Sequence, residues 1–258
     1  MRNSNRKAKG GGNEMIKIYN GDCLEVMSRF KDKSIDAIIT DPPYGTTACK
    51  WDKVICFDCM WEQLKRVVKD KGAIVLFGSE PFSSALRMSN IKNYKYDWIY
   101  HKSLATGFLH AKKQPLRNHE LISIFYNKQG TYNPQKTAGK PYKAKRGKTK
   151  GQSITNDPAR IAGYQTINKG DRYPLTVTQK WNVETGFHPT QKPVALMEYL
   201  IKTYTNEGET VLDFTMGSGT TLVACKRTNR NGIGIEQDKK YCETAIERLK
   251  NETSHPTA

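Results

Sequence analysis

The tetrapeptide Asp41–Tyr44 combines groups that can bind and activate an amino group. Its residues are Asp41, Pro42, Pro43 and Tyr44. The two prolines fix φ and carry no N–H, so the backbone here offers only carbonyl acceptors. A carboxylate and a fixed carbonyl can accept two hydrogen bonds from an amine, and an aromatic ring can stack on the flat ring that carries it. The tetrapeptide therefore predicts a site for an exocyclic amine, with a proline-rich turn as the structural alternative.

The residues before the tetrapeptide indicate where it lies. Ile35–Thr40 is an apolar, β-branched run that ends at two prolines, which is typical of a buried strand that stops at its carboxyl end. Open α/β sheets bind their ligands at this edge. We therefore expect Asp41–Tyr44 at a ligand-binding edge.

A second motif lies late in the chain. The predicted strand Thr210–Asp213 is followed by a glycine turn that opens a helix, formed by Gly217, Ser218, Gly219 and Thr220. Glycines there let the backbone approach a ligand closely. The next predicted strand ends at Glu236, 19 residues after Gly217. An acidic residue about 20 positions on is placed to bind ribose hydroxyls, so the order of these elements predicts a nucleoside site.

The details of the glycine turn favour S-adenosylmethionine (SAM). Threonine rather than lysine follows Gly219, which speaks against triphosphate binding, and Leu222 replaces the third glycine of a dinucleotide site. SAM has no phosphate and tolerates both differences. We expect its ribose at Glu236 and its amino acid end at Asp213 and Lys192.

Lys192 belongs to the segment His188–Pro193, which leads into a predicted helix at Val194–Tyr204. A helix N-terminus with a nearby lysine suits a carboxylate, although the segment alone indicates no more than a well-started helix.

The chain as a whole alternates predicted strands and helices. Strand patterns fall near Ile16–Tyr19, Ile35–Thr40, Ala73–Gly78, Tyr96–Tyr100, Leu121–Tyr126, Thr210–Asp213 and Gly232–Glu236. Helical patterns fall near Leu24–Phe30, Met60–Lys69, Pro81–Met88, Val194–Tyr204, Thr220–Arg230 and Lys239–Lys250. This alternation predicts an α/β fold with a mostly parallel, twisted sheet covered by helices on both faces. We expect residues 15–126 and 187–250 to form this domain.

The segment 127–186 interrupts the pattern and is expected to be an insertion. Its first part, from Lys128 to Lys150, holds eight basic residues and no acidic residue, with tyrosines interspersed. Basic residues among aromatic ones suit contact with nucleic acid, whereas a solvated flexible loop is the structural alternative. The residues expected to contact nucleic acid are Lys136, Lys140, Lys143, Lys145, Arg146, Lys148 and Lys150.

Composition is consistent with such a partner. The 258 residues carry a formal net charge of +17, which favours a polyanion but also suits solubility or an anionic membrane surface. No apolar stretch approaches the roughly 20 residues that span a bilayer. Residues 1–14 lack the apolar region of a secretory signal, so a cytoplasmic protein is expected.

The two ends of the chain and its cysteines add minor expectations. Residues 1–14 are expected to form a disordered basic tail, with Met15 hypothesised as the natural start, and 251–258 a C-terminal tail. The six cysteines are expected to be free thiols. Cys56 and Cys59 invite a zinc site, but no second ligand pair follows at a suitable spacing, so buried structural cysteines and no metal are predicted.

Together these motifs resemble the β-class SAM-dependent DNA amino-methyltransferases, which modify adenine N6 or cytosine N4. In that family the Pro-Pro-Tyr motif comes first, the target-recognition region next and the SAM motif last, a circular permutation of the commoner order. The resemblance covers roughly Ile16 to Leu249 and implies a Rossmann-like methyltransferase fold, SAM as methyl donor and 127–186 as the target-recognition region.

The resemblance also assigns a role to Asp22. The segment Asn20–Glu25 matches the stretch in which the family's aspartate contacts the adenine of SAM, although Asp22 would equally suit a helix N-cap. One departure concerns Asp213–Thr215, which reads Asp-Phe-Thr where the family commonly has Asp-Pro-Phe. Phe214 and Thr215 are therefore not assigned to the SAM site.

The implied reaction is site-specific methylation of a base flipped out of double-stranded DNA. Asp41 at the first motif position favours adenine N6, whereas the family's cytosine-N4 enzymes have serine there. RNA methylation, protein glutamine methylation and a non-catalytic nucleic-acid-binding protein of the same fold are alternatives. The resemblance leaves open a cognate restriction endonuclease and a homodimer as further partners.

Overall fold

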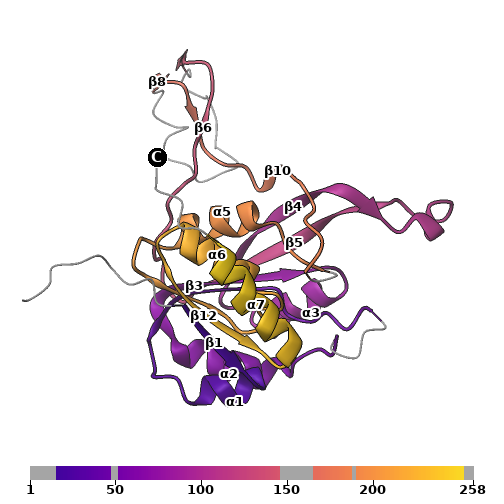
Figure 1. Ribbon diagram of the computed structural model, residues 1–258. Helices are drawn as coiled ribbons and strands as arrows, with labels where there is room; N and C mark the ends of the chain where they lie inside the picture. The colour runs from indigo at the N-terminus through magenta and orange to yellow at the C-terminus, as the bar shows by residue number, and fades with distance from the viewer. Residues whose placement is uncertain (1–15, 48–51, 146–164, 188–189, 253–258) are drawn as a thin grey trace, which may run out of the picture. The chain divides into compact units, whose positions relative to one another are not determined.

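A computed structural model describes residues 16–47, 52–145, 165–187 and 190–252 (Figure 1). The expected N-terminal tail and nearly all of the expected C-terminal tail therefore lie outside the described residues. The chain divides into two compact units, a small one at Pro134–Leu175 and a large one that comprises the rest.

The large unit is built on an eight-stranded sheet in the order β1-β12-β11-β2-β3-β5-β4-β10. The strands are β1 (Ile16–Asn20), β12 (Asn231–Glu236), β11 (Thr210–Asp213), β2 (Ile35–Thr40), β3 (Val68–Gly78), β5 (Arg117–Phe125), β4 (Tyr94–Thr106) and β10 (Val177–Trp181). Only the pairings of β5 with β3 and with β4 are antiparallel. The predicted mostly parallel α/β fold is thus confirmed.

Helices cover both faces because side chains alternate along the strands. In β2, Ala37 and Ile39 join one apolar cluster and Ile38 joins the other. The first cluster includes α5 (Val194–Tyr204) and α6 (Thr220–Arg227), and the second includes α1 (Cys23–Ser28), α2 (Phe57–Val67) and α3 (Phe82–Ser89). α7 (Lys239–Asn251) packs near β1 and β12.

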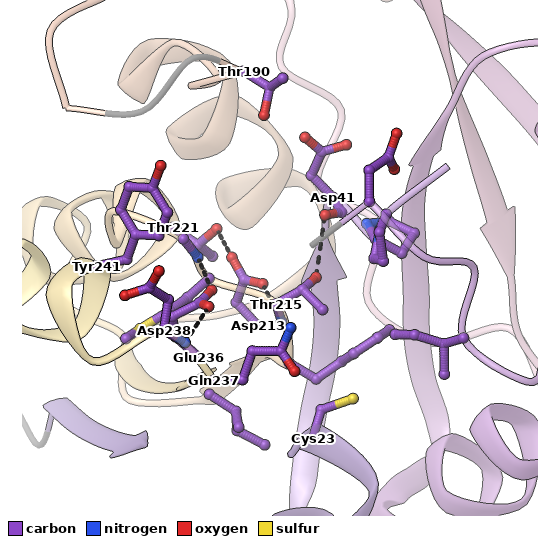
Figure 2. A pocket seen from close by; sticks show the side chains of 18 of the residues that line it. Cys23, Asp41, Thr190, Asp213, Thr215, Thr221, Glu236, Gln237, Asp238 and Tyr241 are labelled. Atoms are coloured by element: carbon purple, nitrogen blue, oxygen red, sulfur yellow. Dashed lines mark hydrogen bonds between the residues drawn. The ribbon is translucent and has the colours of Figure 1, made fainter. Parts of the chain in front are cut away.

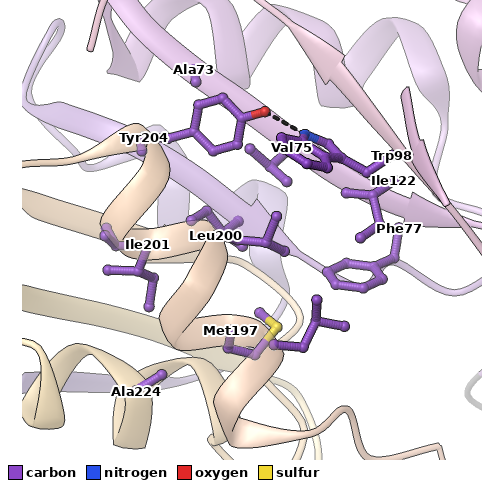
Figure 3. Close-up of a cluster of buried hydrophobic side chains, with 14 of the residues drawn as sticks. Ala73, Val75, Phe77, Trp98, Ile122, Met197, Leu200, Ile201, Tyr204 and Ala224 are labelled. Carbon is purple, nitrogen blue, oxygen red and sulfur yellow. Dashed lines mark hydrogen bonds between the residues drawn. The ribbon is translucent and has the colours of Figure 1, made fainter. Parts of the chain in front are cut away.

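The cluster under α5 is the larger core (Figure 3). Leu200 and Phe77 are fully buried there. Polar groups at the edge of this cluster pair with each other, because the indole N–H of Trp98 donates to the hydroxyl of Tyr204 over 2.7 Å. This packing holds α5, and hence the segment before it, against the sheet.

Two predictions about local structure need correction. The helix predicted to run through Lys69 ends at Val67, because Val68 is already extended and pairs with Ile35. Cys56 and Cys59 were predicted to be buried, yet both are exposed, since Cys56 caps α2 and Cys59 lies in its first, solvent-facing turn.

In the part of the small unit that the structure describes, there are four short strands. β6 (Thr137–Ala138) pairs with β9 (Asp171–Arg172), and β7 (Tyr142–Lys145) pairs with β8 (Gln165–Asn168), both antiparallel. Residues 176–186, which the sequence placed in the insertion, belong to the large unit instead. There β10 pairs with β4 and Trp181 is buried.

In the ranges that the structure describes, none of the helices combines the length and the apolar character needed to cross a membrane.

Candidate active site

A cavity of about 470 Å³ lies in the large unit and brings the two predicted motifs together (Figure 2). Of the twelve predicted catalytic and SAM-binding residues, eleven line it and Gly219 does not. These eleven are Asp22, Asp41, Pro42, Pro43, Tyr44, Lys192, Asp213, Gly217, Ser218, Thr220 and Glu236.

The sheet explains why motifs 170 residues apart meet. β2 and β11 are parallel neighbours, so their carboxyl ends lie at the same edge. Asp41 follows the last residue of β2, and Asp213 is the last residue of β11.

Hydrogen bonds fix these two ends to each other. The hydroxyl of Thr215 donates to the backbone carbonyl of Asp41 over 3.1 Å (Figure 2). The hydroxyl of Thr40 donates to Asp213 over 2.5 Å. The backbone that carries the Asp41 carboxylate is therefore tied directly to the turn after β11.

Asp213 is buried within a ring of hydroxyl donors. Its carboxylate accepts from the hydroxyls of Thr40 and Thr221 and from the backbone N–H of Thr215. Burial nevertheless raises the pKa of Asp213 to about 6, because these neutral donors compensate only part of the lost hydration. The hydrogen bonds of the Asp213 carboxylate thus hold the loop together, but at neutral pH they require a buried negative charge.

This shift predicts how stability depends on pH. A carboxyl whose folded pKa lies above its unfolded value stabilises the fold below the unfolded pKa, and that contribution is lost as pH rises through about 6. From pH 4.5 to 7.5, the loss is about 2 kcal/mol for a shift from 3.8 to about 6. Asp213→Asn cannot ionise. We therefore expect its unfolding free energy, measured with urea, to rise by that amount relative to wild type between these two pH values. A difference between the two proteins that does not vary with pH would contradict the shift.

Asp41 lies in an ionic cluster. One of its carboxylate oxygens accepts from the hydroxyl of Tyr44, and the other forms an ion pair with the buried ammonium of Lys192. Lys192 also lies 3.2 Å from Glu120, which in turn lies 3.2 Å from Lys102. Two carboxylates therefore share the ammonium of Lys192.

The cluster shifts the pKa of each member. Burial raises the pKa of Asp41, and the nearby Glu120 adds to this, although Lys192 opposes it. Burial also works to raise the pKa of Glu120, but Lys192 and Lys102 outweigh it and the net direction is downward. The pKa of Lys192 is raised despite burial, because both carboxylates stabilise its charge.

Tyr44 presents its ring to the cavity. It stacks on Phe82 with ring centroids 5.1 Å apart and planes inclined by 30°. Phe82 is buried in the first turn of α3, so one side of the Tyr44 ring has a fixed support.

The glycine turn is anchored by Glu236. Its carboxylate accepts from the backbone N–H of Gly217 over 3.0 Å and from that of Asp238 over 2.9 Å. Gly219 has φ of +79°, and a Cβ there would meet the Cβ of Ala245 at 2.7 Å. Gly219 is therefore required for the close approach of α7, which is why it does not line the cavity.

Asp22 serves as the N-cap of α1. Its carboxylate accepts from the backbone N–H groups of Leu24, over 2.8 Å, and Glu25, over 3.2 Å. The capping role that the sequence left open is thus present, and Asp22 also lines the cavity.

The charges around the cavity fit SAM. The acidic residues lining it are Asp22, Asp41, Asp52, Glu120, Asp213, Glu236 and Asp238, whereas the basic ones are Lys53 and Lys192. The ammonium of Lys192 is already shared by two carboxylates. A nucleotide with phosphates would be repelled, while a nucleoside with a sulfonium and an ammonium group is favoured. Glu236 and Asp22 would hold the ribose and adenine of SAM, whose methyl group is the chemistry it supplies.

Sequence reasoning missed Glu120 and Phe82. Glu120 is the polar residue just before the apolar part of β5, and no pattern in the chain connects it to Lys192. Phe82 reads as an ordinary core residue of an amphipathic helix. β5 pairs with β3, the neighbour of β2 in the sheet, and α3 packs on β3 and β5, so only the tertiary arrangement brings both residues to the site.

The predicted nucleic-acid contacts lie in the small unit. Lys136 forms an ion pair with Asp171 over 2.6 Å, and its ammonium lies 4.5 Å from the ring centroid of Tyr173. Lys140 and Lys143 are exposed. Lys145 ends β7, and the predictions for Arg146, Lys148 and Lys150 fall outside the described residues.

Comparisons with known proteins identify the family. Residues 35–247 match a family model described as DNA methylase. The Type II methyltransferase M.HpaI of Haemophilus parainfluenzae is 31% identical over 244 residues, covering 90% of this chain and 73% of that protein. The Type II methyltransferase M2.MboI of Moraxella bovis is 27% identical, and the match covers 91% of this chain and 90% of that protein.

Solved structures give the same result. The M1.HpyAVI–SAM complex is 29% identical with a TM-score of 0.60, covering 91% of this chain and all of that one. The cytosine-N4-specific PvuII DNA methyltransferase has a TM-score of 0.66 at 16% identity, covering 91% and 86%, and so shares the fold. With its acidic cavity joining the Asp-Pro-Pro-Tyr tetrapeptide to the glycine turn, this chain belongs to the SAM-dependent DNA amino-methyltransferases, the family of DNA methylases that act on adenine N6 or cytosine N4.

Proposed function

We propose that this DNA methyltransferase methylates adenine N6 at a specific sequence in double-stranded DNA. The observation that carries the proposal is the position of Asp41, whose carboxylate faces the cavity between Tyr44 and Lys192. Asp41 supports adenine because the family's cytosine-N4 enzymes have serine at this place.

The reaction requires activation of a weak nucleophile, since the lone pair of an exocyclic amine is delocalised into the purine ring. The Asp41 carboxylate and the Pro42 carbonyl accept the two N–H groups of this amine, so the nitrogen becomes more tetrahedral and its lone pair is localised. Each carboxylate oxygen has two lone pairs, so Asp41 accepts this bond while it keeps Tyr44 and Lys192 as donors. With SAM bound at Glu236 and Asp22, the nitrogen would form a bond to the methyl carbon as the bond from that carbon to sulfur breaks and S-adenosylhomocysteine leaves. The contribution of the chain itself rests on positioning and electrostatics.

The methylated nitrogen must lose a proton. Burial raises the pKa of Asp41 above its ordinary value, which improves it as an acceptor. Lys192 then stabilises the carboxylate when the proton leaves to water. Asp41 thus first orients the amine and then accepts its proton.

The target base must leave the duplex to reach this cavity. The Tyr44 ring is supported on one side by Phe82, so the flipped base stacks on its other side. A fixed ring loses little conformational freedom when the base binds.

Product analysis tests the choice of base. The protein is incubated with unmethylated bacterial DNA and SAM carrying a labelled methyl group, and the digested nucleosides are identified by mass spectrometry. We expect N6-methyladenine, and modification-sensitive sequencing then gives its sequence context. Labelled N4-methylcytosine would assign the enzyme to the other base, and label in RNA but not in DNA would overturn the DNA substrate.

We further propose that the small unit, Pro134–Leu175, contacts the DNA. Within the described residues Lys140 and Lys143 form no ion pair, whereas Lys136 is paired with Asp171. Replacing both Lys140 and Lys143 with alanine should flatten the dependence of log K on log[salt] by about 0.9 for each phosphate that is no longer neutralised. Lys136→Ala should change the slope less, because Asp171 already balances that charge. An unchanged slope in the double variant, measured by fluorescence anisotropy, would place this unit off the DNA.

A further inference from the structure

The hairpin formed by β4 and β5 extends beyond the rest of the sheet (Figure 1). The last residue of β3, Gly78, pairs with Leu121, but the pairing of β4 with β5 continues as far as Thr106 and Arg117. Because β5 is antiparallel to β3, the overhang lies at the carboxyl end of β3, the same edge at which Asp41 follows β2. The hairpin therefore projects from the edge that carries the active site.

The tip of this hairpin exposes two adjacent large apolar side chains. Every residue from Thr106 to His119 is exposed. Phe108 is 69% exposed and Leu109 is 98% exposed. Side chains this exposed do not stabilise the described fold, and adjacent large apolar groups on a projecting loop mark a contact surface.

The outer part of the hairpin carries basic side chains. Residues 101–119 include four lysines or arginines and three histidines, and no acidic residue. Among the described residues, neither Lys112 nor Lys113 has an ion-pair partner, and Arg117 is held by a 3.1 Å hydrogen bond to the hydroxyl of Ser79. This charge suits a polyanion and opposes a second copy of the same hairpin.

The base of the hairpin joins the catalytic cluster. Lys102 of β4 pairs with Glu120 of β5, and Glu120 approaches Lys192, the partner of Asp41. A molecule that binds the hairpin therefore acts on strands whose base lies next to the residues that receive the flipped base.

We propose that the β4–β5 hairpin is a second DNA-contact element. Phe108 and Leu109 enter the duplex beside the target base, while Lys112, Lys113 and Arg117 contact the flanking phosphates. Apolar side chains inserted at a base step unstack it, and this lowers the work of moving the target base into the cavity. The inference rests on the proposed function, because it takes duplex DNA as the substrate.

The first test compares paired with unpaired targets. Once the recognition sequence is known, single-turnover methylation is measured on a duplex and on the same duplex with a mismatch at the target base. We expect Phe108→Ala combined with Leu109→Ala to slow methylation of the duplex at least about tenfold, and that of the mismatched DNA by less than about threefold. The matched control is Met88→Ala with Ile91→Ala, two exposed apolar residues near the amino end of β4, which should change neither rate.

Equal slowing on both substrates would overturn the proposed entry of Phe108 and Leu109 into the duplex, and so would an unchanged rate of duplex methylation. A variant that changes from dimer to monomer in analytical ultracentrifugation while keeping its duplex rate would make the tip a self-association surface instead. A wild type that methylates no DNA would refute the proposed function itself.

The second test concerns the proposed phosphate contacts of the hairpin. Lys112→Ala with Lys113→Ala should lower the salt slope of DNA binding by about 0.9 for each phosphate that these lysines neutralise in the wild type. Lys31→Ala with Lys92→Ala, two exposed lysines near the amino ends of β2 and β4, serves as the charge-matched control and should leave the slope unchanged. Equal slopes for the two double variants would overturn the phosphate contacts.

Discussion

Replacing Asp41 with alanine is expected to lower the rate of methyl transfer to DNA by roughly a thousandfold, the loss typical when a preorganised hydrogen-bonding group is removed from a catalytic site. The variant loses both the acceptor that orients the amine and the acceptor for its proton. Its fold should persist, because the Asp41 backbone carbonyl still accepts from Thr215. The measurement is incorporation of labelled methyl under single-turnover conditions.

Two controls make this result interpretable. Asp70→Ala removes an exposed carboxylate beyond the cavity lining and should leave the rate unchanged. SAM affinity, measured by calorimetry, should change little in Asp41→Ala, since Glu236 and Asp22 are the residues predicted to hold the nucleoside. A normal methylation rate for Asp41→Ala would refute the assigned role, and loss of SAM binding would mean that Asp41 belongs to the cofactor site instead.

The second large effect is expected at Lys192. Lys192→Met leaves two partly buried carboxylates, Asp41 and Glu120, without their shared cation. Breaking such a buried pair costs about 3 kcal/mol of unfolding free energy. Because Lys192 lowers the pKa of Asp41, its loss raises that pKa further, so the ionised form is reached only at higher pH. We therefore expect lower stability, a reduced rate and an activity profile displaced toward alkaline pH.

A double variant separates this mechanism from a simple packing defect. Glu120→Gln removes the second carboxylate, so adding it to Lys192→Met should recover part of the unfolding free energy and return the pH profile toward that of wild type. No recovery in either measurement would mean that the unpaired carboxylate of Glu120 does not cause the defect of Lys192→Met. Thermal and urea unfolding with the pH dependence of single-turnover rates provide the readouts.

Several features could be predicted from the sequence because their causes are local. The prolines after Ile35–Thr40 end the strand through their own geometry, and glycines permit the turn at Gly217 and Gly219 through φ values of +50° and +79°. The alternation of strands and helices follows from apolar periodicity. With the resemblance of the motifs, this was enough to predict the fold, the methyl donor and the family.

Other features depend on contacts between distant segments. Lys192 was expected to bind the carboxylate of SAM, which stays a prediction, but no pattern placed its ammonium between Asp41 and Glu120, residues 151 and 72 positions away in the chain. Likewise β10 lies in a polar segment that reads as part of an insertion, and it becomes a strand of the main sheet only because β4 offers a free edge and Trp181 is buried there.

The sequence by itself thus determined which chemistry the chain carries, because backbone restrictions and side-chain types are properties of single residues and short motifs. The tertiary structure decided which charges share a site and which apolar side chains remain exposed at Phe108 and Leu109. Both depend on the pairing register and packing of strands that are far apart in the chain, and burial and Coulomb energies are determined only when those distances are known.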